Sequence, residues 1–393
     1  MVHVPEYYEF YCPVKIVSGK KALANLPYEM DQLGTSKAMV ITDKGVVGAG
    51  LLDKVKAVFE GSQAEICAVY DDTPPDSSDK VVNQVADIYK EKGCDCLVAV
   101  GGGSAIDTAK GVSIVVTMGE SNLLKFQGAE RIKEELLPFI VVPTTAGTGS
   151  EATAAAVITH VDKGIKMSIT SYKLLPNTAI IDPDMTVTMP PKITAATGMD
   201  ALTHAVEAYY CLQKNPVSDV YSLSAIKLIM GNLIKTIEDG ADKEARLAMA
   251  NAALLAGISF SNSLVGVVHS LAHATGGVAH VPHGVANAIC LPWGVEYNIG
   301  KAGGFIAELA PEMGVTDVSG VDEQDARAVV DAIRDLLNRL NKLADLPVRL
   351  RDAGVKEEQL ADIAKVAIND GTVAMNPEEV TYEDALELLK KAY

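Results

Sequence analysis

The first half of the chain alternates short apolar runs with amphipathic segments, and this alternation constrains the fold more than any other feature. Apolar runs at residues 38–42, 64–70, 96–100 and 138–143 are each followed by a loop, and the first three loops lead into helical patterns. Further short runs, "AAVITH", "KMSIT" and "NTAIIDP", precede Pro190. Repeated strand, loop and helix patterns predict a parallel sheet that is covered by helices.

The pattern changes after Pro190 and Pro191, where apolar residues recur at helical spacing, as in "SLSAIKLIMGNLIKTI" and "ARAVVDAIRDLLNRLNKLADL". Near the end, Asn376-Pro377 places a proline where a helix can start. Thr381 with Asp384 three residues later has the pattern of a capping box. A chain of 393 residues is also too long for one ordinary core. We therefore expect an α/β domain over residues 1–189 and an all-helical domain over residues 190–393.

Charge and hydropathy exclude some partners. A net charge of −17 argues against nucleic acid and against anionic membrane surfaces, since both need positive charge. No signal peptide is visible, and no apolar run approaches the ~18 residues of a membrane span. The six cysteines are scattered, and only Cys94 and Cys96 are close. We expect free buried thiols in a soluble, cytoplasmic protein.

The stretch "CLVAVGGGSAIDTAKG" has the pattern of a strand, a glycine run and the start of a helix. Gly101, Gly102 and Gly103 would let backbone N–H groups approach a pyrophosphate, and Ser104 would cap the helix whose positive end attracts the same anion. The run is not the G-x-G-x-x-G fingerprint, and glycine turns after strands often only reverse the chain. The nucleotide interpretation therefore needs support from other loops.

Two further loops supply that support. "PTTAGTGSEAT" follows a second parallel strand and carries hydroxyl groups at Thr144, Thr145 and Thr148, so both loops converge on one crevice. Asp43 follows another strand, where a carboxylate would accept a bond from a ribose hydroxyl and repel a 2′-phosphate; its simpler role is that of a turn residue. Lys166 is a candidate cation for ribose or phosphate, although an isolated lysine is more often a solvated charge.

Four of the seven histidines fall between residues 269 and 283, and they predict a metal site. "GMDALTHAVEAY" and "VVHSLAHATGG" both place ligand-type residues four apart, on one helix face. Gly276 and Gly277 are expected to end the second helix, so that the chain can turn and deliver His283. One carboxylate with several imidazoles suits Fe(II), Zn(II) or Mn(II), whereas single residues of this kind are often helix caps or core histidines. Spacing does not choose among the six candidates, and at least one histidine should remain free for proton transfer. The candidates are Asp200, His204, His269, His273, His280 and His283.

Together, "GGGSAIDTAK", "PTTAGTGSEAT", "GMDALTHAVEAY" and "VVHSLAHATGGVAHVPHGVANA" resemble the iron-containing (group III) alcohol dehydrogenases, over nearly the whole chain. The resemblance implies a dehydroquinate-synthase-like fold with a nucleotide-binding α/β domain and an all-α C-terminal domain. It implies metal ligation by Asp200, His204, His269 and His283, and a proton-relaying His273 near the nicotinamide, with His280 only a neighbour. It implies the cofactor-binding set Asp43, Gly101, Gly102, Gly103, Ser104, Asp107, Thr144, Thr145, Thr148, Lys166 and Phe260, in which Phe260 is the lid aromatic and an acidic residue at position 43 favours NAD over NADP.

The implied activity is reversible, metal-dependent and NAD(H)-linked oxidation of a primary alcohol or diol to the aldehyde. The implied metal is Fe(II), with Zn(II) or another divalent ion as the alternative, and the implied assembly is a homodimer or a larger homo-oligomer. Two other functions keep the same frame: another dehydroquinate-synthase-like enzyme of the glycerol dehydrogenase type, and a non-catalytic metal-binding relative. Dehydroquinate synthase itself would need several cations around a phosphorylated substrate, and the histidine-rich segment lacks them.

Overall fold

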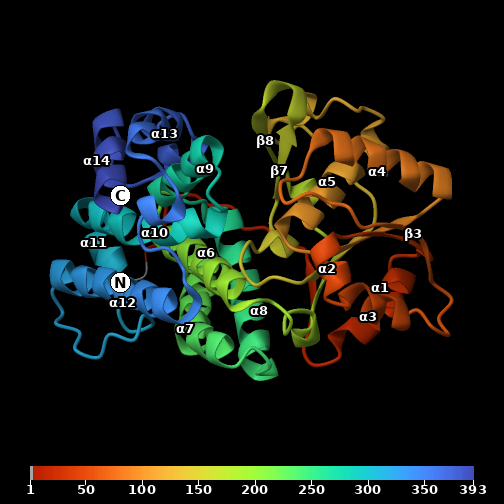
Figure 1. The fold of residues 1–393 in the computed structure, drawn as a ribbon, viewed down its shortest axis with the longest axis horizontal. Helices are drawn as coiled ribbons and strands as arrows, with labels where there is room; N and C mark the ends of the chain where they lie inside the picture. The colour runs from red at the N-terminus through yellow and green to blue at the C-terminus, as the bar shows by residue number, and fades with distance from the viewer. Residues whose placement is uncertain (1–2) are drawn as a thin grey trace. The chain divides into compact units, whose positions relative to one another are not determined.

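The computed structural model describes residues 3–393, which form two compact units (Figure 1). The α/β unit comprises Tyr11–Thr145 and Gly149–Thr188, and the helical unit comprises the N-terminal segment up to Phe10, Ala146–Thr148 and Met189–Tyr393. The predicted fold class, an α/β part followed by a helical part, is confirmed. The division differs from the expected 1–189 and 190–393 ranges because two short segments of the first half pack with the helices.

The α/β unit is built on a six-stranded sheet in the order β1-β9-β6-β4-β2-β3, and every neighbouring pair is parallel. Its predicted strands are confirmed. The edge strand β1 was not predicted because its residues are mostly exposed and form no apolar run. The strands are β1 (Lys15–Ser18), β2 (Lys37–Ile41), β3 (Glu65–Tyr70), β4 (Cys96–Gly101), β6 (Phe139–Pro143) and β9 (Thr178–Ile181).

Helices cover both faces of this sheet, which explains why its strands are almost continuously apolar. Met39 and Ile41 of β2 pack in the cluster that contains the apolar faces of α4 and α5, while Ala38 and Val40 pack with α1, α2 and α3. The alternation of side chains along a strand produces this division. The helices are α1 (Leu26–Gln32), α2 (Lys44–Gly48), α3 (Leu51–Ala57), α4 (Asp79–Lys92) and α5 (Gly103–Met118).

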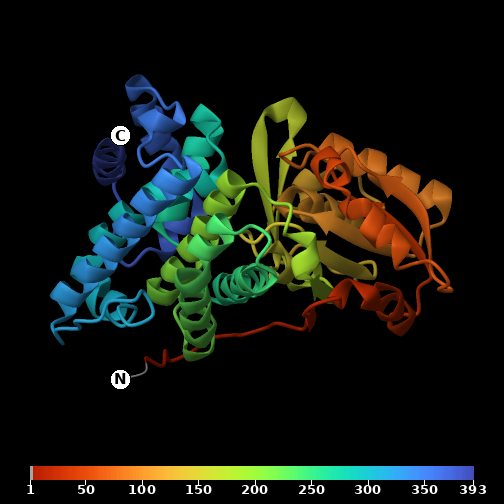
Figure 2. The same ribbon diagram turned by 60° about the horizontal axis from the view of Figure 1, so that its bottom comes forward.

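A second, smaller sheet has the order β5-β8-β7. Its strands are β5 (Gly128–Ala129), β7 (Ala155–His160) and β8 (Ile165–Thr170), and the antiparallel β7–β8 hairpin is prominent in Figure 2. The two predicted strands at these positions exist, but they pair with each other and lie outside the parallel sheet. Their buried residues, including Ile158 and Met167, pack in the cluster of α4 and α5.

The helical unit consists of α6 (Pro191–Tyr210), α7 (Pro216–Glu238), α8 (Lys243–Ser263), α9 (Val267–Ala279), α10 (His283–Tyr297), α11 (Ile299–Ala307), α12 (Asp322–Ala344), α13 (Leu360–Ala367) and α14 (Tyr382–Ala392). The capping box of Thr381 and Asp384 is confirmed at the start of α14. The expected helix start at Pro377 is wrong, because the Asn376 side chain is hydrogen-bonded inside the unit and the chain enters a helix only at Tyr382.

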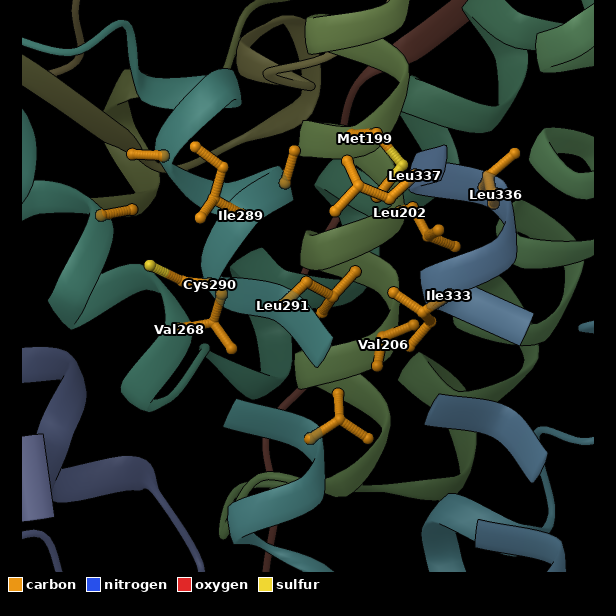
Figure 3. Close-up of a cluster of buried hydrophobic side chains, with 14 of the residues drawn as sticks. Met199, Leu202, Val206, Val268, Ile289, Cys290, Leu291, Ile333, Leu336 and Leu337 are labelled. Atoms are coloured by element: carbon orange, nitrogen blue, oxygen red, sulfur yellow. The ribbon is translucent and has the colours of Figure 1, made fainter. Parts of the chain in front are cut away.

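Apolar side chains of α6, α9, α10 and α12 meet in the core of the helical unit (Figure 3). They include Met199, Leu202 and Val206 of α6, Val268 of α9, Ile289, Cys290 and Leu291 of α10, and Ile333, Leu336 and Leu337 of α12. Burying each large side chain of this kind stabilises the fold by about 1.5–3 kcal/mol. The helices that carry the candidate ligands are therefore held rigidly by their apolar faces.

Helix α7 is long and apolar enough, by length and composition, to cross a membrane; its most apolar 18-residue window has a mean hydropathy of 1.2 and is 44% buried. The bent pair α8 and α9 passes the same test only if both helices are counted as one span. In the helical unit, α7 contributes Ile226, Ile229 and Leu233 to the core that it shares with α6 and α8. A core helix satisfies these criteria as readily as a membrane span does.

The expectation of free thiols is wrong for two of the six cysteines. Cys67 of β3 forms a disulfide with Cys94, which lies between α4 and β4, and their Cα atoms are 6.2 Å apart. Cys96 faces the opposite side of the sheet and remains a free, buried thiol. Cys96 is the near neighbour of Cys94 in the chain, whereas Cys67 lies 27 residues away and is brought to Cys94 only by β3.

Candidate functional site

Asp200, His204, His269 and His283 come together in the helical unit. Each offers one ligand atom, and these atoms all lie within 4.8 Å of one another. Asp200 and His204 project from consecutive turns of α6, His269 comes from α9, and His283 is the first residue of α10. The first three side chains are buried, and that of His283 is 39% exposed. Three imidazoles and one carboxylate form a donor set that suits a divalent transition metal.

The turn between α9 and α10 delivers His283 to this group. The expectation that Gly276 and Gly277 end the helix is wrong: α9 continues through both and ends where His280 adopts a left-handed conformation with φ of 57°. Pro282 then starts α10. Gly284 allows the close approach, because a Cβ there would lie 2.5 Å from the carbonyl oxygen of Ala196 in α6. His280 therefore has a place in the fold as a helix-ending residue.

The imidazoles of His204 and His269 have the charge state that metals prefer. Burial lowers the pKa of both rings, and it lowers that of His269 well below the ordinary value. Both rings are therefore neutral at pH 7, and a neutral imidazole has a free nitrogen lone pair for a metal. The aromatic ring of Phe260, from α8, stacks on His204 with ring centroids 4.2 Å apart and shields it. Phe260 was expected beside the nicotinamide; its contact here is with a candidate ligand.

Glu207 was not predicted, although it lies three residues after His204 on the same helix. Its carboxylate is fully buried, and Oε2 lies 2.6 Å from Nδ1 of His269. It also accepts hydrogen bonds from the backbone N–H groups of Val268 and His269. Burial raises the pKa of Glu207 to about 7, against the lowering effect of those backbone donors. A carboxylate behind a ligating histidine is a recurrent feature of metal sites.

Asn287 was also missed, although it lies four residues after His283 on α10. Its Nδ2 donates a hydrogen bond of 2.7 Å to Oδ1 of Asp200 and lies 3.1 Å from Nε2 of His283 and 3.3 Å from Nε2 of His269. Its Oδ1 is buried and has no hydrogen-bond partner among the described residues. The helix spacing of i and i+4 that revealed the histidines also contained this amide.

His273 stands beside the four-residue group. Its ring stacks on that of His283 with centroids 5.2 Å apart, and its Nδ1 lies 2.9 Å from Oδ2 of Asp370. Asp370 precedes the short 3-10 helix Gly371–Met375, and its Oδ1 accepts two bonds from Thr372. Burial alone would raise the pKa of Asp370, but the hydrogen bonds from His273 and Thr372 hold it below its ordinary value. No sequence signal links Asp370 to a histidine 97 residues away.

In the α/β unit, the glycine run has the geometry of a close-packed turn. Gly101 ends β4, Gly102 precedes α5 and Gly103 begins it. A Cβ on Gly101 would lie 2.6 Å from Cβ of Ala105, and one on Gly102 would lie 3.1 Å from Oγ1 of Thr145. The expectation that Ser104 caps α5 is wrong, because Ser104 lies inside the first turn and donates to the carbonyl of Pro75. The start of α5 thus has no side-chain cap.

Asp43 and Lys166 both have protein partners. Asp43 is the N-cap of α2, and its Oδ1 accepts a bond of 2.9 Å from the backbone of Val46. Its Oδ2 lies beside the glycine run, 3.5 Å from the position of a Cβ on Gly101. Lys166 of β8 forms an exposed ion pair with Asp76 at 2.8 Å. The turn role considered for Asp43 is therefore present, and one of its oxygens also faces the glycine loop.

The loop "PTTAGTGSEAT", residues 143–153, is held by a buried hydrogen-bond network that sequence reasoning missed. Lys110 of α5 donates to the carbonyl oxygens of Ser150, Thr153 and Ala155 at 2.9, 2.9 and 2.7 Å. Asp107 uses both carboxylate oxygens inside the protein, for the Ser150 hydroxyl and the backbone of Val157. Burial lowers the pKa of Lys110 to about 8 and raises that of Asp107. Asp107 therefore uses both carboxylate oxygens to hold the loop.

The two threonines that begin the loop pack against the glycine run. Thr144 donates its backbone N–H to the carbonyl of Gly101 at 3.0 Å, and the Thr145 side chain faces Gly102. Thr148 lies in the segment that belongs to the helical unit, where a Cβ on Gly147 would be 2.7 Å from Cβ of Thr197 in α6. Thr144 and Thr145 therefore lie beside the glycine run, as the two-loop hypothesis requires.

Two family models cover most of the chain. The model described as "Iron-containing alcohol dehydrogenase" matches residues 13–183, and "Fe-containing alcohol dehydrogenase family, C-terminal" matches residues 194–393.

The chain belongs to the iron-containing alcohol dehydrogenase family.

Its relatives in this family match over almost their whole length. The chain is 37% identical to the NAD-dependent methanol dehydrogenase of Bacillus methanolicus, over 98% of this chain and 99% of that protein. It is also 37% identical to the 1,3-propanediol dehydrogenase of Klebsiella pneumoniae, over 95% and 96%. Among solved structures, that of a 1,3-propanediol oxidoreductase superposes with a TM-score of 0.94 at 36% identity, over 99% and 100% of the two chains. These matches confirm the family resemblance and the fold class.

Proposed function

We propose that this member of the iron-containing alcohol dehydrogenase family is a metal-dependent, NAD(H)-linked enzyme that reversibly oxidises a primary alcohol or a diol to the aldehyde by hydride transfer. The observation that carries the proposal is the group of Asp200, His204, His269 and His283, with the hydrogen-bonded pair of His273 and Asp370 beside it. A metal site without chemistry would not need, beside its ligands, a further histidine that is oriented by a carboxylate.

The residues present fit a divalent metal. The ligand atoms are close enough to share one ion, two of the imidazoles are buried and neutral, and Asp200 offsets one positive charge. Three nitrogens and one oxygen accept Fe(II) and also Zn(II), which such sites often hold more tightly. We propose Asp200, His204, His269 and His283 as the ligands, and Fe(II) as the ion in the cell.

The α/β unit fits a dinucleotide. The start of α5 has no side-chain cap, a Cβ on Gly101 would collide with Ala105, and one on Gly102 would be in tight contact with Thr145. The backbone N–H groups at a helix start of this kind suit a pyrophosphate. We propose that Gly101, Gly102, Gly103, Ser104, Thr144 and Thr145 line the cofactor site of this unit, together with Asp43 and Lys166. For Thr148 and Phe260, which belong to the helical unit, the proposal of cofactor contact rests on the family resemblance alone. We propose a supporting role for Asp107, whose two oxygens are engaged by Ser150 and Val157. Asp43 would favour NAD, because its carboxylate repels a 2′-phosphate.

In the proposed mechanism, a bound metal supplies Lewis acidity that lowers the pKa of an alcohol hydroxyl, and the nicotinamide supplies the hydride acceptor. The chain's own residues hold and move the proton. Asp370 binds Nδ1 of His273, so Nε2 of His273 is left to accept the hydroxyl proton and pass it to solvent. The His273 side chain is 40% exposed, which gives that proton a route out. Phe260 shields His204 from water on one ring face.

The substrate class follows from the relatives, which include methanol and 1,3-propanediol dehydrogenases and lactaldehyde reductases. A panel of methanol, ethanol, butanol, 1,2- and 1,3-propanediol and glycerol, with NAD or NADP, would test the proposal after reconstitution with Fe(II), Zn(II) or Mn(II). NADH formation with at least one primary alcohol or diol is expected. Strict preference for glycerol would favour the glycerol dehydrogenase type, and tight metal binding without NAD binding would favour a non-catalytic relative.

We also propose a homodimer or larger homo-oligomer in the cytoplasm. The location needs a test of its own, because the Cys67–Cys94 disulfide is of a kind that is rare in strongly reducing compartments such as the cytoplasm. Lysing cells directly into a denaturing buffer with an alkylating reagent, and then counting the modified cysteines, would decide this point. Modification of all six thiols would support a reducing, cytoplasmic location. Modification that spares Cys67 and Cys94 would contradict it, because only a disulfide would protect them.

A further inference from the structure

We propose that Glu207 is a positioning residue that fixes the proton of His269 on Nδ1 and thereby directs the lone pair of Nε2 towards the other ligands. The inference rests on the proposed metal site and adds a residue that the ligand set does not contain. Glu207 acts through His269, so its removal should weaken metal binding while all four ligands are still present.

The contacts of Glu207 define its role. Its side chain is fully buried, and its donors include the backbone N–H of Val268 at 2.8 Å, the backbone N–H of His269 at 3.2 Å and Nδ1 of His269 at 2.6 Å. The first donor binds Oε1, and the other two bind Oε2. Both carboxylate oxygens are therefore used as acceptors.

This arrangement fixes the tautomer of His269. A carboxylate that already accepts backbone N–H bonds on both oxygens is an acceptor for the imidazole as well, so the ring proton belongs on Nδ1. Nε2 is then unprotonated, and it faces the group formed with Asp200, His204 and His283, as its distance of 3.3 Å from Nδ2 of Asn287 shows. Hydrogen bonding at one ring nitrogen commonly decides which nitrogen binds a metal.

The glycine before α9 makes these contacts possible. A Cβ on Gly266 would lie 3.1 Å from Oε1 of Glu207 and 2.7 Å from Oδ1 of Asn376. Without a side chain at this N-cap, two side chains from elsewhere cap α9: Asn376 accepts from Val267, and Glu207 accepts from Val268 and His269. Only Glu207 also contacts the imidazole, so Asn376 provides a matched control for the capping role.

The decisive comparison is Glu207→Gln against Asn376→Ala, with Zn(II) alone as the probe. A glutamine has one acceptor oxygen, so it cannot serve both the Val268 N–H and the His269 ring from separate oxygens. We expect Glu207→Gln to lower Zn(II) affinity by about 10- to 100-fold, the range seen for such outer partners. Asn376→Ala should keep the wild-type affinity even where it lowers the stability of the metal-free protein.

A second measurement needs no variant. In metal-free wild-type protein labelled with ¹⁵N-histidine at pH 8, NMR should show His269 with its proton on Nδ1. A proton on Nε2 would overturn the inference, as would equal Zn(II) affinity in wild type and Glu207→Gln, or an equal loss in Asn376→Ala. A wild-type protein that binds no Zn(II) would overturn the proposed metal site and this inference with it, so the two failures are distinguishable.

Discussion

The two units use their polar side chains in different ways. In the helical unit, the candidate ligands face one another. Carboxylates lie behind two of the histidines: Glu207 contacts the ligand His269, and Asp370 contacts His273, which stands beside the ligands. In the α/β unit, Asp107 and Lys110 turn inwards and hold the loop. The candidate site of the helical unit is made of side chains, whereas that of the α/β unit is made of backbone groups that side chains hold in place. We therefore expect substitutions in the two units to impair different properties of the protein.

The largest effect is expected for His269→Ala. This change removes a ligand from the core of the helical unit, so bound metal and turnover should both be lost. Metal content by mass spectrometry and NADH formation would be measured on the same preparation. His280→Ala is the matched control, because it removes a histidine of the same segment that only ends α9. Full activity of His269→Ala in a metal-free state would contradict the proposed role of the helical unit in metal binding.

In the α/β unit, Lys110→Met should lower stability and leave metal binding intact. Three carbonyl oxygens, two of them on buried residues, lose their charged donor, which should lower the free energy of unfolding by about 3 kcal/mol. Urea unfolding gives this value, while NAD and Zn(II) titrations separate the two sites. The exposed Lys163→Met should stay within about 0.5 kcal/mol of wild type. Loss of Zn(II) binding in Lys110→Met would mean that a substitution in the α/β unit also impairs the metal site of the helical unit.

Asp370→Asn should lower kcat by about 10²-fold and leave bound metal unchanged, since asparagine keeps an oxygen for Thr372 but removes the charge that faces His273. The pH dependence has a definite sign. The pKa of Asp370 is held below its ordinary value, so the stabilisation from its ionised form is complete above about pH 4 and is lost as the pH falls further. Wild type should show this loss in acid unfolding, and Asp370→Asn should not. An unchanged kcat would remove Asp370 from the proposed mechanism.

The smallest effect concerns Asp43, and two variants separate its two roles. Asp43→Ser keeps a side-chain cap on α2 but removes the charge, so preference for NAD over NADP should fall by about tenfold for ~1.4 kcal/mol of lost repulsion. Asp43→Ala should show the same shift and a further loss of about 1 kcal/mol in stability. Initial rates with both cofactors and thermal unfolding would measure these effects. An unchanged cofactor ratio in Asp43→Ser would leave Asp43 with the capping role alone.

The sequence predicted the elements whose signal is local. The strands β2, β3, β4 and β6 are continuous apolar runs, and the i, i+4 pairs on α6 and α9 lie on single helix faces. Spacing left six candidate ligands, and the family resemblance chose four that the structure brings together. Glu207 and Asn287 had a usable signal, because they share helix faces with His204 and His283.

What the sequence could not predict depends on contacts between distant segments. Asp370 reaches His273 across 97 residues, and Cys67 reaches Cys94 only because β3 and the α4–β4 loop are neighbours. Ser104 was expected as a cap because a serine follows the glycine run, but α5 begins one residue earlier and its hydroxyl binds Pro75. The α9 boundary was misplaced because a Gly-Gly pair usually ends a helix, whereas here His280 takes the left-handed conformation.

The central claim is that one divalent ion, held by Asp200, His204, His269 and His283, enables NAD-linked alcohol oxidation. The most direct test adds Fe(II) anaerobically, in fractions of an equivalent, to chelator-treated protein and follows NADH formation from 1,3-propanediol or butanol. Activity should start near zero, rise linearly and reach a plateau at one ion per chain. Undiminished activity in the metal-free protein, or no activity after one equivalent of Fe(II), Zn(II) or Mn(II), would contradict the claim.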